Sequence, residues 1–323
     1  MKNSLAIAIA LILFYACEPT NGSRMLSSSS GNINSLSVVI DNELWEGSVG
    51  EAARSVLAAP IYGLPQEEPL FTMRQMPPQV FTDFATKNRT VFKVETGKEA
   101  GTKFLKDVYA KPQVLILVTG NSSEEIINEI NENAKRIVSA FKNAELKEKQ
   151  RRIRISLHKN NSLEEKLGIT MNFPSVYRIA KETDNFYWIR KDIKTGTMNL
   201  MVYEMPWGSI SEGENAINDI IKMRDSIGKA YIPGPVDGSY MITEASYTPF
   251  LTKTIIDNKP ALLTKSTWEV ENAFMAGPFI NYIIKDEINN RLMVAEGFTF
   301  APSVEKRDHM FELEAIIQSL KIR

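Results

Sequence analysis

The stretch RLMVAEGFTFAPSVEKRDHMFELEAIIQSLK, residues 291–321, decides the fold of this 323-residue chain. Its first part, 291–302, is rich in apolar and aromatic residues and ends at Ala-Pro, which is typical of a strand. Its second part places apolar residues at the three- and four-residue spacing of one helix face. These are Met310, Leu313, Ile316, Ile317 and Leu320. A strand followed by an amphipathic helix predicts a terminal helix packed on one face of an antiparallel sheet.

The sequence before this stretch supplies the other strands of that sheet. Residues 175–206 predict three antiparallel strands, with turns at Thr183–Asn185 and Lys194–Thr197. PALLTKSTWEVE and PFINYIIKDEINN predict two more. The segment SEGENAINDIIKMRDSIG predicts a helix that begins at Ser211 with Glu214 and ends at Gly228.

The first half of the chain mixes helices and strands without strict alternation. SSEEIINEINENAKRIVSAF predicts a helix because Ser122 and Glu125 have the spacing of a capping box before an apolar stripe. Strands are expected within 36–41 and at QVLILVTG, which is apolar on both faces. The predicted class is therefore α+β, with two mixed α/β halves. We expect an N-terminal domain at 36–159, a linker at 160–168 and a C-terminal domain at 169–323.

The charge of the chain indicates which kinds of binding partner are favoured or disfavoured. With 38 basic and 39 acidic residues the formal net charge is −1, which disfavours nucleic-acid binding. Residues 142–159 are locally basic and are compatible with a patch for anionic lipid headgroups. Glu145 and Glu148 interrupt this run, so a helix end followed by an edge strand with a solvated basic face is favoured.

The amino terminus predicts export and a lipid anchor. Residues 1–16 have one basic residue, a short apolar run and a final small residue, as in a secretory signal peptide. The run is shorter than the roughly 20 residues that span a bilayer. Cys17, the only cysteine, follows directly in Phe14-Tyr15-Ala16-Cys17, which resembles the lipobox of bacterial lipoproteins. An ordinary signal peptide with an incidental or reactive cysteine is the alternative. Residues 17–35 predict a flexible tether.

The sequence contains no HExxH or CxxC metal motif, no G-x-S-x-G elbow, and neither of the glycine-rich nucleotide-binding loops. The two histidines, His158 and His309, lie in different predicted elements, so we expect no metal site and no cofactor. Two carboxylates in a cleft could still hydrolyse a glycan. Trp188 and Trp207 are the candidate aromatics for such a ligand cleft, although large aromatics are more often core residues.

Asp225-Ser226-Ile227 resembles the short acceptor motif for O-glycosylation of exported Bacteroidetes proteins. Ser226 is therefore a candidate glycosylation site. A helix residue without modification is the simpler interpretation.

Four stretches together resemble the domain of unknown function 4837 family, predicted lipoproteins of Bacteroidetes. They are LWEGSVGEAARSVLAAPIYGLPQEEPLF, FPSVYRIAKETDNFYWIRKD, MAGPF and the stretch at 291–321. The most specific motifs are GLPQ-x-EP at Gly63–Pro69 and EGF-x-x-AP followed by Lys306-Arg307, and the resemblance runs from about residue 36 to the carboxyl end. The resemblance implies no assigned activity and hence no transferred catalytic residue. The closing strand and helix are also distantly similar to the PsbP and DcrB type of fold.

The resemblance and the predicted anchor together suggest a location and a role. Glu18 is the only acidic residue directly after Cys17, which favours the periplasmic face of the outer membrane over the cell surface. We expect a non-catalytic binding or assembly module whose partner is an envelope protein or glycan. The alternatives are a carboxylate-dependent envelope hydrolase and a subunit of a larger complex, for which an exposed apolar patch at Met275–Phe279 would be a sign.

Overall fold

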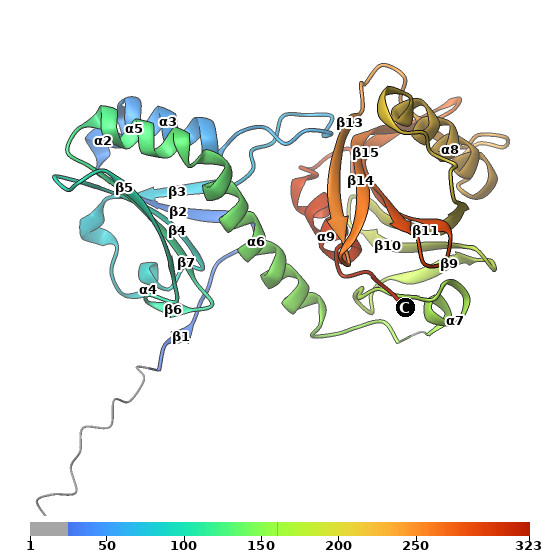
Figure 1. Cartoon of the computed structure of the whole chain (residues 1–323), viewed down its shortest axis with the longest axis horizontal. Helices are drawn as coiled ribbons and strands as arrows, with labels where there is room; N and C mark the ends of the chain where they lie inside the picture. Colours follow the sequence, from blue (N-terminus) through green and yellow to red (C-terminus); the bar gives the residue numbers. More distant parts are fainter. Residues whose placement is uncertain (1–24, 160) are drawn as a thin grey trace, which may run out of the picture.

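The structure is a computed structural model that describes residues 25–159 and 161–323. The signal peptide at 1–16, Cys17 and the first part of the tether lie outside the described residues. Two sheets, each with its own hydrophobic core, form an N-terminal unit (residues 25–153) and a C-terminal unit (residues 155–323) (Figure 1). Helices and sheets of this kind confirm the predicted α+β class.

The N-terminal unit is built on a five-stranded sheet in the order β3-β2-β4-β7-β5. Its first four strands are parallel and β5 is antiparallel to β7. The strands are β2 (Ser35–Val39), β3 (Thr72–Met76), β4 (Thr90–Thr96), β5 (Gly101–Lys106) and β7 (Val114–Gly120). Buried strands of a parallel sheet are apolar on both faces, which explains why β7 reads as a continuous apolar run.

Helices cover both faces of this sheet. One face carries α2 (Asn42–Glu46), α3 (Ser48–Leu57), α5 (Ser123–Glu132) and α6 (Ala134–Ile153), over the main core. The other carries the short helices η1 (Pro78–Val80) and α4 (Asp83–Thr86), over a smaller core. Ser122 caps α5 as predicted, since its hydroxyl accepts a hydrogen bond from the Glu125 backbone nitrogen.

Three expectations for the first half are wrong. The predicted helix over 122–141 is two helices, because Asn133 separates α5 from α6. The basic segment continues α6 as far as Ile153, and no edge strand follows beyond a single bridge between Leu157 and Pro174. The end of the predicted tether is ordered: β1 (Ser27–Ser28) pairs in parallel with β6 (Ala110–Lys111).

The C-terminal unit is an eight-stranded antiparallel sheet in the order β12-β14-β15-β16-β11-β10-β9, with β13 also paired to β14. The sheet contains all six strands that the sequence predicts for this half and two more, β12 and β13, that it does not predict. They are β9 (Arg178–Glu182), β10 (Phe186–Ile193), β11 (Gly196–Pro206), β12 (Met241–Thr243), β13 (Phe250–Ile256), β14 (Lys259–Val270), β15 (Ala273–Asp286) and β16 (Arg291–Phe300).

The sheet lies between two helices. On one face is α9 (Arg307–Ile317), the predicted amphipathic helix, whose apolar stripe is buried in the larger core. A Cβ at Gly297 of β16 would lie 2.7 Å from the Cβ of Leu313, so the glycine lets α9 approach the sheet. On the other face is α8 (Ala216–Tyr231), preceded by η2 (Gly213–Asn215).

The segment 160–168, expected to be a linker, contains a helix. Residue 160 is outside the described residues, but α7 (Ser162–Leu167) follows it, and Leu163 and Leu167 are buried in the core of the C-terminal unit. The two leucines are four residues apart, so they share one helix face and can be buried together. A short ladder of β8 (Ile169–Thr170) and β17 (Lys321–Ile322) then closes the unit.

Candidate functional site

The junction of the two units is centred on α9. Glu68, in the GLPQ-x-EP motif, is buried and accepts hydrogen bonds from the backbone nitrogens of Lys306 and Arg307 at 2.7 and 2.8 Å. A carboxylate at this position satisfies free N–H groups at a helix start and complements the helix dipole. Residues 63–69 and 306–307, which lie more than two hundred residues apart in the sequence, therefore meet across the junction.

The junction continues through the side chain of Arg307. Its guanidinium donates to the carbonyl of Pro69 at 3.2 Å and to the hydroxyl of Thr72 at 3.0 Å. Asn34, at the start of the first sheet, donates to Asp308 at 3.0 Å. These hydrogen bonds connect the first turn of α9 to two parts of the N-terminal unit: the segment that leads into β3, and the residue before β2.

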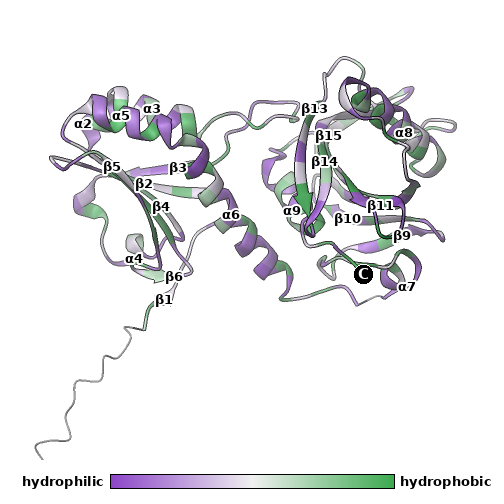
Figure 2. Ribbon diagram, in the orientation of Figure 1, coloured by the Kyte–Doolittle hydropathy of each residue, from purple (hydrophilic) through white to green (hydrophobic). Residues whose placement is uncertain are grey.

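Side chains of helix α6 contact the other side of α9. Lys149 Nζ lies 2.6 Å from Glu312 Oε2 and Lys142 Nζ lies 2.9 Å from Glu314 Oε1. Gln150 donates to the carbonyl of Ala315 at 3.2 Å. The basic surface of α6, which is largely hydrophilic in Figure 2, is therefore used in part for contact with α9.

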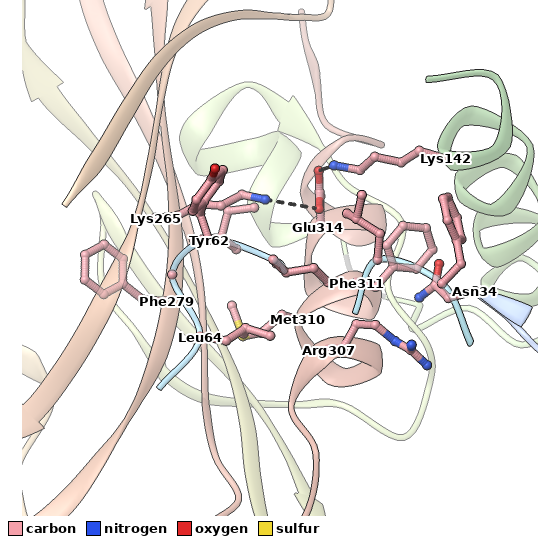
Figure 3. Close-up of a pocket in the computed structure, with 15 residues that line it drawn as sticks. Asn34, Tyr62, Leu64, Lys142, Lys265, Phe279, Arg307, Met310, Phe311 and Glu314 are labelled. Atoms are coloured by element: carbon pink, nitrogen blue, oxygen red, sulfur yellow. Dashed lines mark hydrogen bonds and ion pairs between the residues drawn. The ribbon is translucent and has the colours of Figure 1, made fainter. Parts of the chain in front are cut away.

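A cavity of about 60 Å³ lies in this junction. Figure 3 shows Glu314 between Lys142 and Lys265; the second ammonium lies 3.9 Å from the carboxylate. Burial lowers the pKa of Lys265. Burial alone would raise the pKa of Glu314, but the two ammonium groups outweigh it and hold the pKa below its ordinary value.

The size of the junction cavity limits what it can hold. A buried water needs roughly 10–15 Å³ of such space, so the cavity has room for a few waters and not for a sugar or a cofactor. Its charged groups are already paired with one another. The junction is consequently a structural connection between the units.

A larger pocket, of about 480 Å³, lies beside Trp207. It is formed where the loop between β11 and α8 leaves the sheet face, and Trp207 is 41% exposed there. Its floor is apolar and comes from four neighbouring strands. The floor residues are Leu251, Leu262, Ile283 and Leu292. Two lysines, Lys253 and Lys285, and one carboxylate, Glu212, also line it.

Trp188 lines a different and smaller pocket, of about 230 Å³. Its indole nitrogen donates to the side chain of Asn199 at 3.0 Å, and the guanidinium of Arg190 lies near its ring. Among the described residues that line this pocket there is no carboxylate. The two candidate tryptophans therefore belong to separate pockets, and neither pocket presents a pair of acidic groups.

The remaining sequence candidates lie apart from these pockets. Ser226 is exposed on α8, next to Asp225, whose carboxylate accepts from the backbone and the hydroxyl of Thr243. His158 stacks on Phe173. His309 is half-buried, and burial lowers its pKa.

The segment Met275–Phe279 is not an exposed apolar patch. Its last three residues are buried because β15 is covered there, and the exposed aromatic is the preceding residue, Phe274. A single exposed apolar residue is ordinary for a protein surface.

The described residues contain neither a cluster suited to a metal ion nor a helix suited to cross a bilayer. Within 25–159 and 161–323, no group of three or more His, Cys, Asp or Glu side chains is placed to hold a metal ion. No helix in the same ranges is both long and apolar enough to cross a bilayer.

The chain belongs to the family described as Domain of unknown function (DUF4837), which matches residues 156–319, about half of the chain. A second family, Domain of unknown function (DUF8532), matches residues 29–154. The boundary between the two matches coincides with the end of α6. The predicted resemblance extended the first family to about residue 36, but the Gly63–Pro69 motif lies within the match to the second. A comparison with curated proteins finds no match.

Two solved structures are similar to part of the chain. A crystal structure from Bacteroides thetaiotaomicron VPI-5482 at 1.50 Å resolution is 16% identical, with a TM-score of 0.27, covering 48% of this chain and 45% of that one. The crystal structure of LpqN, involved in cell envelope biogenesis of Mycobacterium tuberculosis, is 10% identical, with a TM-score of 0.28, covering 47% and 82%. The chain thus spans less than half of the first structure. The similarity to PsbP and DcrB stays a prediction.

Proposed function

We propose that this protein is a lipid-anchored, non-catalytic binding module of the cell envelope, held in the outer membrane through Cys17 and facing the periplasm. The observation that supports binding is the pocket beside Trp207. Its volume, about 480 Å³, lies within the range of roughly 300–1,000 Å³ that is usual for small-molecule sites. Its apolar floor and few polar groups are also typical of such sites.

The chemistry of the pocket favours binding over hydrolysis. A glycosidase needs two carboxyl groups about 5–10 Å apart on either side of the scissile bond. Glu212 is the single carboxylate among the described residues of this pocket, and its side chain is 89% exposed and paired with Lys285. A single exposed carboxylate that is paired with an ammonium group does not supply the two carboxyl groups that this hydrolysis needs.

The anchor is tested by intact-mass analysis of the protein from its native membrane fraction, beside a Cys17→Ala variant. We expect a lipid-sized mass increment that disappears in the variant, together with release of the variant into the soluble fraction. An unmodified cysteine or an uncut leader would overturn the anchored location.

The absence of catalysis is tested separately. Incubation of the purified protein with cell-wall glycan fragments is expected to release no new reducing ends. Release that Glu212→Gln abolishes would support the hydrolase instead.

A further inference from the structure

The pocket beside Trp207 exposes apolar surface on a sheet face that is otherwise covered. Helix α8 begins only at Ala216, so the part of the face formed by β13, β14 and the ends of β15 and β16 is covered by the loop alone. As a result Leu251 and Leu262 remain only partly buried, whereas Ile283 and Leu292 behind them are buried. The loop contributes a further apolar side chain, Ile210, above them.

The strand register places this apolar surface in two adjacent rows across the sheet. Lys253 of β13 is opposite Leu262 of β14, which is in turn opposite Ile283 of β15. Lys285 of β15 is opposite Leu292 of β16. Directly opposite residues of antiparallel strands have side chains on the same face, so Lys253 and Lys285 project from the same face as these apolar residues.

The charge at the rim is unbalanced. Lys285 pairs with Glu212 at 3.1 Å, whereas Lys253 is exposed and has no ion pair within the described part of the chain. The pocket therefore combines an apolar floor, an indole ring and one surplus ammonium group. A long apolar group with a negative charge at one end would satisfy all three.

We infer that this pocket binds an acyl chain that carries an anionic head group, a carboxylate or a phosphate, with the chain on the leucine floor and the head group between Lys253 and Lys285. The inference rests on the proposed binding role but not on the anchor. Since each buried methylene strengthens binding about fourfold, affinity rises steeply with chain length until the floor is covered.

The test uses the full chain with Cys17→Ala, freed of bound lipid, and isothermal titration calorimetry. Dodecanoate is the probe, octanoate tests the apolar floor, and the neutral dodecanol tests the charge. We expect dodecanoate to bind more than tenfold more tightly than octanoate, and more tightly than dodecanol. Dodecyl phosphate in parallel distinguishes a lipid phosphate from a free fatty acid as the preferred source of the head group.

Variants separate the two parts of the site. Lys253→Gln with Lys285→Gln is expected to weaken dodecanoate by about threefold to tenfold and to leave dodecanol unchanged, because two exposed charges contribute modestly. Lys103→Gln, an exposed lysine on β5, is the matched control. Leu262→Gln is expected to weaken both ligands, with a thermal melt to confirm that it folds.

Three outcomes would overturn the inference. They are no binding of dodecanoate, equal binding of dodecanoate and dodecanol, and an equal loss with Lys103→Gln. None of these changes the lipid-mass result at Cys17, so the inference and the anchored location can fail independently.

Discussion

The carboxylate of Glu312 in α9 accepts hydrogen bonds from three other parts of the chain. It accepts from Lys149 of α6, from Lys191 of β10 at 2.8 Å and from the Tyr177 hydroxyl at 2.8 Å. Burial alone would raise the pKa of Glu312, but the two ammonium groups outweigh it and lower the pKa to about 2. The charged form is thus favoured in the folded protein.

This carboxylate predicts a pH dependence of stability. A pKa below its unfolded value gives stability that is complete above about pH 5 and is lost as pH falls toward 2. Between these limits the wild type is expected to lose ~3 kcal/mol more unfolding free energy than Glu312→Gln. Urea unfolding at several pH values measures this. Glu305→Gln, at an exposed site near the start of α9, is the control and should follow the wild type. Parallel curves for wild type and Glu312→Gln would contradict the assignment.

One buried ion pair, between Arg224 and Glu296, leaves a signal in the sequence. Arg224 and Glu296 are almost fully buried between α8 and β16, and their charged atoms lie 2.8 Å apart. Glu296 lies in an otherwise largely apolar central strand, and Arg224 lies on the apolar face of the helix, three or four residues from Ile220, Ile221 and Ile227. A charged residue in each of two buried elements indicates pairing, because an unpaired buried charge is too costly. The sequence alone does not identify the partner.

At the scale of elements, Gly228 is the clearest difference from expectation. It was expected to end α8, but the helix continues to Tyr231. A Cβ at Gly228 would lie 2.0 Å from the backbone oxygen of Met241, so the glycine lets β12 approach the helix. Glycine is needed at position 228 because β12 packs closely against the helix there. The spacing of residues in the sequence does not distinguish such a glycine from one that ends a helix.

The packing at Gly228 is expected to reverse the usual effect of a glycine-to-alanine substitution. In an exposed helix, such a substitution stabilises the protein by about 1 kcal/mol. Here it is expected to destabilise the protein by about 1–3 kcal/mol, because the methyl group overlaps the backbone of β12. Thermal unfolding followed by circular dichroism measures the change. Ser226→Ala, exposed on the same helix, is the control and should change stability little. A higher melting temperature for Gly228→Ala would contradict the packing.

The elements that were predicted well are those with a local signal. The strands β9, β10 and β11 follow from alternating apolar residues and turn residues, and α9 follows from its stripe. Helix α6 was cut short because its second half is charged on nearly every face. Its stability comes from tertiary pairs such as Arg89 with Glu145, which are buried and 2.8 Å apart. Such pairs join residues far apart in sequence and give no local pattern.

At the scale of the whole molecule, Glu68 is expected to couple the two units. If its contact with α9 transmits stability, the wild type should unfold in one calorimetric transition. Glu68→Ala leaves backbone N–H groups without a partner and should separate the unfolding of the units into two transitions. Glu67→Ala, its exposed neighbour, is the control and should keep one transition. A single unchanged transition in Glu68→Ala would show that the other junction contacts suffice.

The junction illustrates the limit of sequence reasoning about sites. The sequence identifies both motifs that form the junction, at 63–69 and 306–307. They are more than two hundred residues apart, and no local sequence pattern indicates that they are in contact. For the pocket beside Trp207, the sequence offered only the tryptophan, as a candidate aromatic of a ligand cleft. The lysines and the open apolar floor of this pocket were not predicted, because both depend on the register of four strands and on where α8 begins.

The position of α9 also has a consequence for biosynthesis. The first sheet and α6 are complete in a growing chain long before α9 is made, yet Lys142 and Lys149 find their partners only on that last helix. The surface of α6 that contacts α9 therefore stays charged and uncovered while the residues between the two helices are synthesised. The junction can close only after α9 has been synthesised, so a chain that stops before α9 leaves these lysines of α6 without their partners.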